Sequence, residues 1–266
     1  SKDSVLKRLN IKDRNKKRPQ PKKKADEASA IQSGGEEQFQ MVATCMQHLE
    51  EELAEEIKQI GGKDIEIQRR AVKFSGDMEL LYKGNVWLRT ALKILKPLFS
   101  FKAKDPDALY KEAKKIAWET VFTEDKTFTI DAAVHSENFN HSQFAALKLK
   151  DAIVDRFREQ QRNRPNVERF QADVRIHLHI NKDSVTISLD SSGDPLFKRG
   201  YRTKQHMAPI NECLAAGLIL KSGWKGEVDF LDPMCGTGTI AIEAALIASN
   251  IPPNLNRIRF AFEGWS

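Results

Sequence analysis

The chain has 266 residues, of which 40% are hydrophobic and 30% are charged, which is typical of a globular protein long enough for two or three domains. No segment approaches the roughly 20 apolar residues that cross a bilayer, and the N-terminus lacks the apolar core of a secretory signal. The three cysteines, Cys45, Cys213 and Cys235, are far apart and have no metal-ligand spacing. We therefore expect no membrane association, no metal site and a reducing, cytoplasmic location.

The positive charge of the protein is concentrated at its N-terminus. Residues 1–25 hold 11 of the 43 Lys and Arg residues and only 2 of the 37 acidic residues, so this segment carries a formal charge of +9 and the rest carries −3. Segment 1–37 has too few apolar residues to form a core, and we predict a disordered basic tail. Its charge suits either non-specific attraction to nucleic-acid phosphates or a merely solvated extension.

Residues 38–104 have the pattern of a small α/β domain. Apolar periodicity predicts strands over 39–44, 65–67, 71–74 and about 92–101, and helices over 46–60 and about 77–88. The first helix has acidic residues near its start and Gly61-Gly62 at its end, as the helix dipole and a glycine C-cap favour. This succession predicts a ferredoxin-like α/β sandwich.

A second unit, residues 105–190, combines two helices with three strands. The pattern predicts helices over about 107–118 and 142–158, and strands over 127–134, 173–180 and 184–189. Asp107 is placed to cap the first helix. Turn residues at 181–183 join the last two strands as a hairpin. His177 and His179 alternate on one strand, without nearby cysteines or paired acids, and we interpret them as ordinary sheet residues.

The third unit, residues 191–266, begins a nucleotide-binding fold. Helices are predicted over 210–221 and 240–249, with a strand over 227–231 and, after it, the loop Asp232-Pro233-Met234-Cys235-Gly236-Thr237-Gly238-Thr239. Strand, glycine loop and helix form the first half of a doubly wound, Rossmann-like sheet. Because a complete domain of this kind needs ~100–150 residues, we expect it to be incomplete here.

The residues of this loop indicate its ligand. Gly236 and Gly238 permit a sharp turn and let a ligand approach the backbone closely. A dinucleotide loop would have a third glycine where Ala241 stands, and the Asp232 carboxylate at the end of the strand would repel a phosphate. The acid suits a ligand with a cationic amino-acid end and no phosphate, such as S-adenosylmethionine. We interpret Cys235 as a small residue that fits the tight loop rather than as a nucleophile.

Several ordered segments together are similar to one family. They are His141-Ser142-Gln143-Phe144 with Lys150–Asp155, Ser188–Asp194 with Lys198–Arg202, Ala208-Pro209-Ile210 with Glu212, and the loop at 232–239. The chain resembles, from about residue 39 to residue 266, the THUMP-domain RNA methyltransferases, close to the bacterial 23S ribosomal RNA guanine-N2 methyltransferases.

The resemblance implies an α/β (α+β) fold made of a ferredoxin-like domain, a THUMP RNA-binding domain and the start of a Rossmann-like methyltransferase domain. It implies methyl transfer to a guanine amino group, in ribosomal RNA or, as the alternative, in tRNA. It also implies that S-adenosylmethionine is bound by Asp232, Pro233, Met234, Cys235, Gly236, Thr237 and Gly238, with Pro209 packed beside it.

The family's Asn-Pro-Pro-Tyr motif is absent. Residues 250–254, Asn-Ile-Pro-Pro-Asn, look similar, but they lack the aromatic residue and contain an inserted Ile. We predict a helix stop and a turn there. The resemblance places the catalytic residues beyond Ser266, and we expect the chain alone to be inactive or to serve as an RNA-binding module.

Two groups of residues are candidates for RNA contacts. The first is Lys198, Arg199, Tyr201 and Arg202, on the connector between the second and third units, and the second is Lys148 and Lys150, on the long helix. Arginine can fork onto phosphates and tyrosine can stack on a base. The alternative for the connector is a linker pinned by Arg–carboxylate pairs, and the alternative for the helix is an ordinary solvated face.

Overall fold

The computed structural model describes residues 37–139, 141–161, 163–202 and 209–265. The predicted basic tail, 1–37, therefore falls almost wholly outside the described residues.

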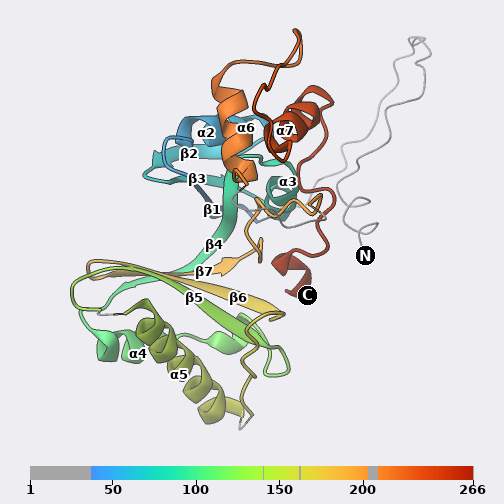
Figure 1. Cartoon of the computed structure of the whole chain (residues 1–266). Helices are drawn as coiled ribbons and strands as arrows, with labels where there is room; N and C mark the ends of the chain where they lie inside the picture. Colours follow the sequence, from blue (N-terminus) through green and yellow to red (C-terminus); the bar gives the residue numbers. More distant parts are fainter. Residues whose placement is uncertain (1–36, 140, 162, 203–208, 266) are drawn as a thin grey trace, which may run out of the picture.

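One seven-stranded sheet passes through both lobes of the molecule (Figure 1). The strand order is β2 (Lys63–Gln68), β3 (Ala71–Gly76), β1 (Phe39–Cys45), β4 (Ala91–Lys102), β7 (Ser184–Asp190), β6 (Val174–Asn181) and β5 (Phe128–His135). Neighbouring strands are antiparallel except β5 and β6, which are parallel. The first part of β4 pairs with β1, whereas Leu95–Lys102 pairs with β7. The two predicted units thus share one sheet through a single long strand.

The first lobe is built on β1 to β4 with the helices α2 (Glu50–Gln59) and α3 (Met78–Trp87). Its core includes Leu53 and Ile57 of α2 and Leu81 of α3. The helix α2 begins four residues later than the predicted 46–60, after His48 adopts a positive φ of 70°. The helix α3 begins as predicted, because Asp77 accepts a hydrogen bond from the Leu80 N–H at 2.8 Å.

The second lobe has α4 (Pro106–Lys115), the short helix η1 (Trp118–Thr120) and α5 (Ser142–Gln161) on one face of β5, β6 and β7 (Figure 1). The prediction that Asp107 caps the first helix is wrong. Asp105 accepts from the Ala108 N–H at 2.8 Å, and Pro106 occupies the first turn, where its missing N–H costs nothing. Asp107 instead pairs with Lys148 at 2.8 Å. The hairpin between β6 and β7 is confirmed, with Lys182 at a φ of 56°.

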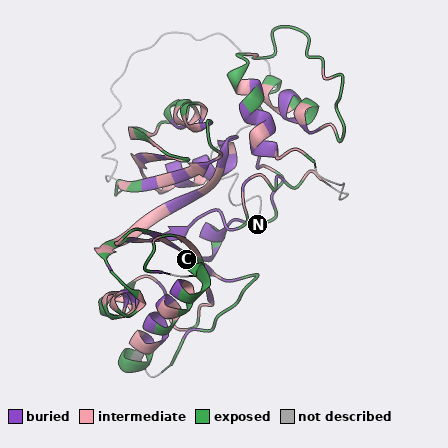
Figure 2. Ribbon diagram, turned by 60° about the vertical axis from the view of Figure 1, so that its left-hand side comes forward, coloured by how far each residue is buried: buried purple, intermediate pink, exposed green. Residues whose placement is uncertain are grey.

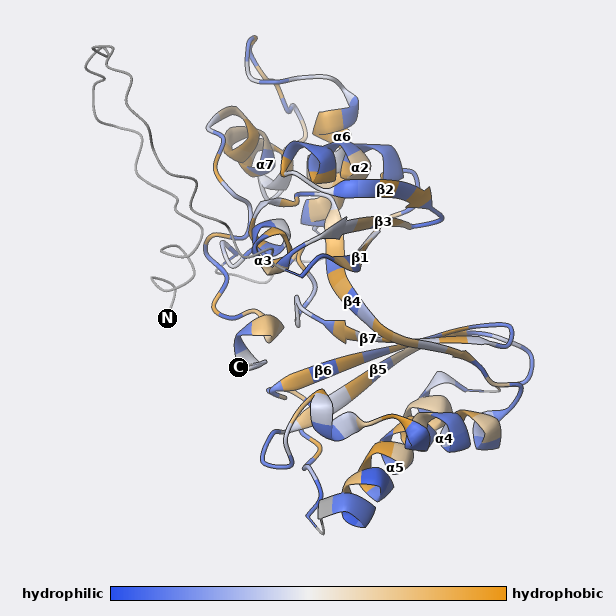
Figure 3. Cartoon of the chain, turned by 180° about the vertical axis from the view of Figure 1, so that it is seen from behind, coloured by the Kyte–Doolittle hydropathy of each residue, from blue (hydrophilic) through white to orange (hydrophobic). Residues whose placement is uncertain are grey.

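The third part of the chain packs on the first lobe with the helices α6 (Glu212–Lys221) and α7 (Thr239–Ala248), which contact each other. The strand predicted at 227–231 is wrong, since these residues are irregular, with Val228 70% and Leu231 86% exposed (Figure 2). A strand needs a hydrogen-bonding neighbour, and none of the described strands pairs with this segment. Most residues of α7 are hydrophobic, as the colouring of its ribbon in Figure 3 shows.

The chain reverses after α7 and ends with a short helix, η2 (Ala261–Gly264). Asn250 adopts a φ of 49°, and the N–H groups of Asn250 and Ile251 bond to the carbonyls of Ile247 and Leu246 at 3.0 and 2.9 Å. These paired bonds form a Schellman motif, so the predicted helix stop is confirmed. Among the described residues, no helix is long and apolar enough to cross a membrane.

Candidate cofactor-binding loop

The glycine loop at 232–239 lies at the N-terminus of α7. Gly236 and Gly238 have φ angles of 52° and 73°, in the left-handed region that favours glycine, and the Gly238 N–H bonds to the Cys235 carbonyl at 2.7 Å. A Cβ placed on Gly238 would meet no atom of the described residues within 4 Å. The loop therefore turns sharply beneath open space, where a ligand can reach its backbone.

Asp232 presents a carboxylate oxygen that needs a partner. Its Oδ1 accepts from the Met234 N–H at 3.2 Å, whereas its Oδ2 is buried and has no hydrogen-bond partner among the described residues. A buried acceptor without a donor is costly, so this oxygen suits a ligand that brings its own N–H group. The ammonium of an amino-acid end is such a donor.

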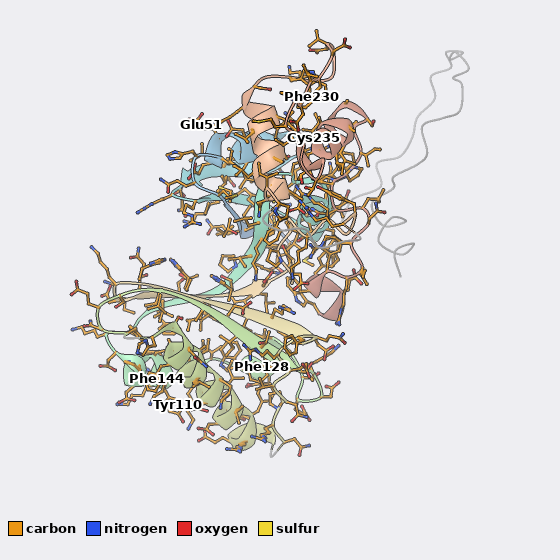
Figure 4. All side chains as sticks on the ribbon, in the orientation of Figure 1. Glu51, Tyr110, Phe128, Phe144, Phe230 and Cys235 are labelled. Atoms are coloured by element: carbon orange, nitrogen blue, oxygen red, sulfur yellow. The ribbon has the colours of Figure 1, made fainter. Side chains whose placement is uncertain are left out.

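Cys235 is exposed rather than packed into the loop (Figure 4). Its side chain therefore does not pack within the loop. Its contribution to the turn is the backbone carbonyl, which accepts the hydrogen bond from the Gly238 N–H. The other two cysteines are buried, and burial raises the pKa of each thiol to about 12. They are therefore protonated and inert at neutral pH.

Arg202 ties the loop to the segment that contains Pro209. Its guanidinium donates to the Glu212 carboxylate at the start of α6, to the Ile210 carbonyl at 3.1 Å and to the Thr239 hydroxyl at 2.8 Å. The hydroxyls of Thr237 and Thr239 lie 3.0 Å apart. One side chain thus fixes the first turn of α7 relative to residues 210–212.

Three family models match successive parts of the chain. The RlmL ferredoxin-like domain matches residues 40–95, the THUMP domain matches 103–190, and the RMKL-like methyltransferase domain matches 199–263. In three successive domains the chain is thus similar to the THUMP-domain methyltransferases. The predicted fold class and domain types are confirmed by these matches together with the structure.

Individual relatives agree with the family models. The ribosomal RNA large subunit methyltransferase K/L of Psychromonas ingrahamii is 48% identical over 210 residues, 79% of this chain and 28% of the relative. The protein of the same name from Syntrophotalea carbinolica is 42% identical over 228 residues, 84% of this chain and 32% of the relative. The chain thus spans about a third of the length of these curated relatives. The structure of SMU.472 complexed with SAH superposes with a TM-score of 0.76 at 33% identity, over 87% of this chain and 61% of that one.

The side chain of Arg199 is engaged within the protein. Its side chain is fully buried and lies 3.4 Å from Glu243 of α7, and it donates to the carbonyls of Arg89 at 2.6 Å and Leu196 at 2.9 Å. The predicted RNA contact of Arg199 is therefore corrected. The alternative, a linker pinned by an Arg–carboxylate pair, describes what the structure shows.

Tyr201 and Arg202 also serve the connector. The Tyr201 hydroxyl donates to Glu243 at 3.0 Å, and burial together with the nearby carboxylate raises the pKa of Tyr201, so it stays a donor at neutral pH. Tyr201 is half-buried, and the Arg202 guanidinium is bonded to Glu212. Both side chains thus already make contacts within the protein. Lys198 remains exposed, 3.4 Å from Asp194.

Lys148 and Lys150 lie on α5, in the lobe opposite the glycine loop (Figures 1 and 4). Lys148 pairs with Asp107 at 2.8 Å and Lys150 with Asp151 at 2.7 Å. Both pairs are at the surface, where exchange of a carboxylate for a phosphate costs little. Their contact with RNA stays a prediction.

Sequence reasoning missed the acids and arginines that hold the connector. Glu243 is the one acid in the apolar helix α7, which is a signal that could have indicated a buried partner. Arg257 donates to the backbone carbonyls of Ser192, Pro195 and Lys198 at 2.9 to 3.3 Å, and so clamps the connector from the other side. Because every residue has a backbone carbonyl, the sequence does not indicate which residues such a buried guanidinium will bond to.

Proposed function

We propose that the protein is a methyltransferase that uses S-adenosylmethionine to methylate ribosomal RNA in the bacterial cytoplasm. The observation that carries the proposal is the buried, unpartnered Oδ2 of Asp232 beneath the open turn at Gly236 and Gly238. The family supports it, because the curated relatives are named ribosomal RNA methyltransferases and SMU.472 was solved with SAH.

We assign the cofactor to the loop from Asp232 to Gly238. Asp232 would accept a hydrogen bond from the ammonium, and the backbone at Gly236 and Gly238 would lie against the ligand. Pro209 would lie beside it, because Arg202 connects residues 210–212 to Thr239. When bound, the cofactor supplies a methyl group on a sulfonium, and this chain's residues bind and orient it.

We propose the exocyclic amino group of guanine as the acceptor, on the resemblance of the ordered motifs to guanine-N2 methyltransferases. Such a base would be extruded from its stack to reach the cofactor. A guanine in tRNA is the second candidate substrate, since a THUMP domain favours RNA without fixing its class.

Nucleoside analysis tests the reaction. A version extended to the full length of the curated relatives, of which this chain spans about a third, is incubated with labelled S-adenosylmethionine and either unmodified ribosomal RNA or tRNA. The digested RNA is then separated by liquid chromatography and mass spectrometry. We expect label in N2-methylguanosine from ribosomal RNA. Label in a methylated adenosine would contradict the proposed acceptor, and label only in tRNA would replace the proposed RNA class.

A further inference from the structure

A groove with a volume of about 1000 Å³ lies where the second lobe meets the connector. Its walls come from four segments that are far apart in sequence. They are residues 169–175 before and within β6, residues 193–202 of the connector, residues 209–212 before α6, and residues 257–261. The groove therefore joins the THUMP lobe to the segment that contains Pro209.

The groove is strongly basic. Seven of its lining residues are Arg or Lys and two are Asp or Glu. Two of the seven are paired with acids outside the lining: Arg199 is buried 3.4 Å from Glu243, and Arg259 lies 3.7 Å from Asp173. The two acids are already paired, Asp194 with Lys198 and Glu212 with Arg202. No acid among the described residues lies within ion-pair distance of Arg169 or Arg175, so an excess of positive charge faces the groove.

An aromatic ring stands beside this charge. Phe170 is 76% exposed, more than any other phenylalanine in the described part of the chain. The Arg169 guanidinium lies 5.9 Å from its ring centroid, and the Arg175 guanidinium donates to its carbonyl at 2.6 Å. Arg169 thus lies over the ring, Arg175 holds the backbone of Phe170, and most of the phenylalanine remains exposed for stacking.

We propose that this groove binds a single-stranded segment of RNA, with a base stacked on Phe170 and phosphates held by Arg169 and Arg175. An exposed aromatic ring between arginines is the combination that binds single strands without reading their sequence. A protein partner would be expected to bring apolar surface, but a groove with this charge excess favours a polyanion. The inference rests on the proposed function for the identity of the ligand as RNA.

The groove extends from the THUMP lobe to the segment that contains Pro209. Lys198, one of the predicted RNA contacts, lines it, and so do Arg202 and Pro209. Arg202 is bonded to Thr239 at the first turn of α7. A strand in the groove would therefore extend from the THUMP lobe towards the cofactor loop.

The binding of a fluorescein-labelled 12-nucleotide oligouridine to the full chain, measured by anisotropy over a salt series, tests the proposal. We expect Phe170→Ala to weaken binding about tenfold, the size of one lost base stack, with an unchanged salt dependence. Arg169→Gln should weaken binding and reduce the slope of log affinity against log salt by about 0.7, because one phosphate contact is lost. Ile67→Ala and Arg164→Gln are the controls, at exposed positions outside the groove, and should bind like the parent.

Photo-crosslinking with a 5-bromouridine strand, followed by mass spectrometry, adds a direct readout. We expect adducts on Phe170 or its neighbours in the groove. Parent-like binding by Phe170→Ala, or adducts confined to other surfaces, would overturn the proposal while leaving the methyltransferase function intact. If Phe170→Ala instead changes only the sedimentation of the chain, the groove is a protein interface and the proposal is wrong. If the parent chain binds no RNA, the proposed function fails with it.

Discussion

At the scale of single residues, Arg199 and Glu243 form a fully buried ion pair. Both side chains are 0% exposed and lie 3.4 Å apart. Removal of one partner of a buried pair leaves an uncompensated charge, whereas removal of both leaves a site that apolar atoms can fill. The pair joins the connector to α7, and so it positions the helix that begins at the glycine loop.

We expect Arg199→Met to destabilise the protein by about 3–5 kcal/mol, measured by urea unfolding. The Glu243 carboxylate would stay buried without its cationic partner, with only the Tyr201 hydroxyl as a donor. The double variant Arg199→Met/Glu243→Met should recover much of this loss. Lys198→Met, at the exposed neighbouring position, should change stability by no more than about 0.5 kcal/mol. If Arg199→Met unfolds at the same urea concentration as the parent, the pair has no such role.

The left-handed residue that ends α7 is a second prediction at this scale. Asn250 is exposed and has a φ of 49°. Its contribution to stability therefore depends more on its backbone conformation than on side-chain contacts. Asn250→Ala should be less stable than Asn250→Gly by about 1 kcal/mol in urea unfolding, because Ala enters the left-handed region at a cost. Equal stability of the two variants would show that the helix end relaxes.

At the level of elements, Asp173 joins the starts of β5 and β6. Its carboxylate accepts from the Thr127 N–H at 3.0 Å and from the Thr127 hydroxyl at 2.7 Å. The hydrogen bonds from the Thr127 backbone and side chain, together with Arg259, lower the pKa of Asp173 below its ordinary value of 3.8. A carboxyl whose pKa is depressed in the folded state contributes stability above its unfolded pKa and loses it as the pH falls through the folded pKa.

We therefore expect Asp173→Asn to be less stable than the parent at pH 7, with a difference that shrinks as the pH falls below about 4. Thermal unfolding of both proteins between pH 3 and pH 7 measures this. Asp131→Asn, an exposed acid within β5, is the control. A stability difference that stays constant over the pH range would contradict the role of the carboxylate charge.

Local signals predicted most elements, because they depend on neighbouring residues. The cap at Asp77, the turn at 181–183 and the glycine loop each follow from side chains within a few residues. The sequence pattern favours Asp107 over the actual cap, Asp105, since both acids precede the same apolar residues and only Pro106 distinguishes them. Residues 227–231 differ from these elements. Their apolar pattern is that of a strand, but a strand forms only where a second strand lies beside it, and the local sequence does not indicate whether one does.

On the scale of the whole molecule, the long strand β4 makes the two lobes continuous. Sequence periodicity indicated a strand at about 92–101 but could not indicate that its two halves pair with β1 and β7, since register depends on residues about 50 and 90 positions away. The same limit applies to Arg199, whose burial depends on Arg89 and Glu243. The composition of the glycine loop, by contrast, predicts a ligand class directly, because the features that the prediction needs lie within eight residues.

The central claim is that the loop beginning at Asp232 binds S-adenosylmethionine. Equilibrium dialysis of labelled S-adenosylmethionine against the parent, Asp232→Asn and Asp229→Asn measures it most directly, since Asp229 is an exposed acid three residues upstream and serves as the matched control. We predict binding by the parent and by Asp229→Asn, and at least a tenfold loss in Asp232→Asn, about 1.4 kcal/mol, because the ammonium loses its charged acceptor. Equal binding by all three proteins, or binding by none, would contradict the claim.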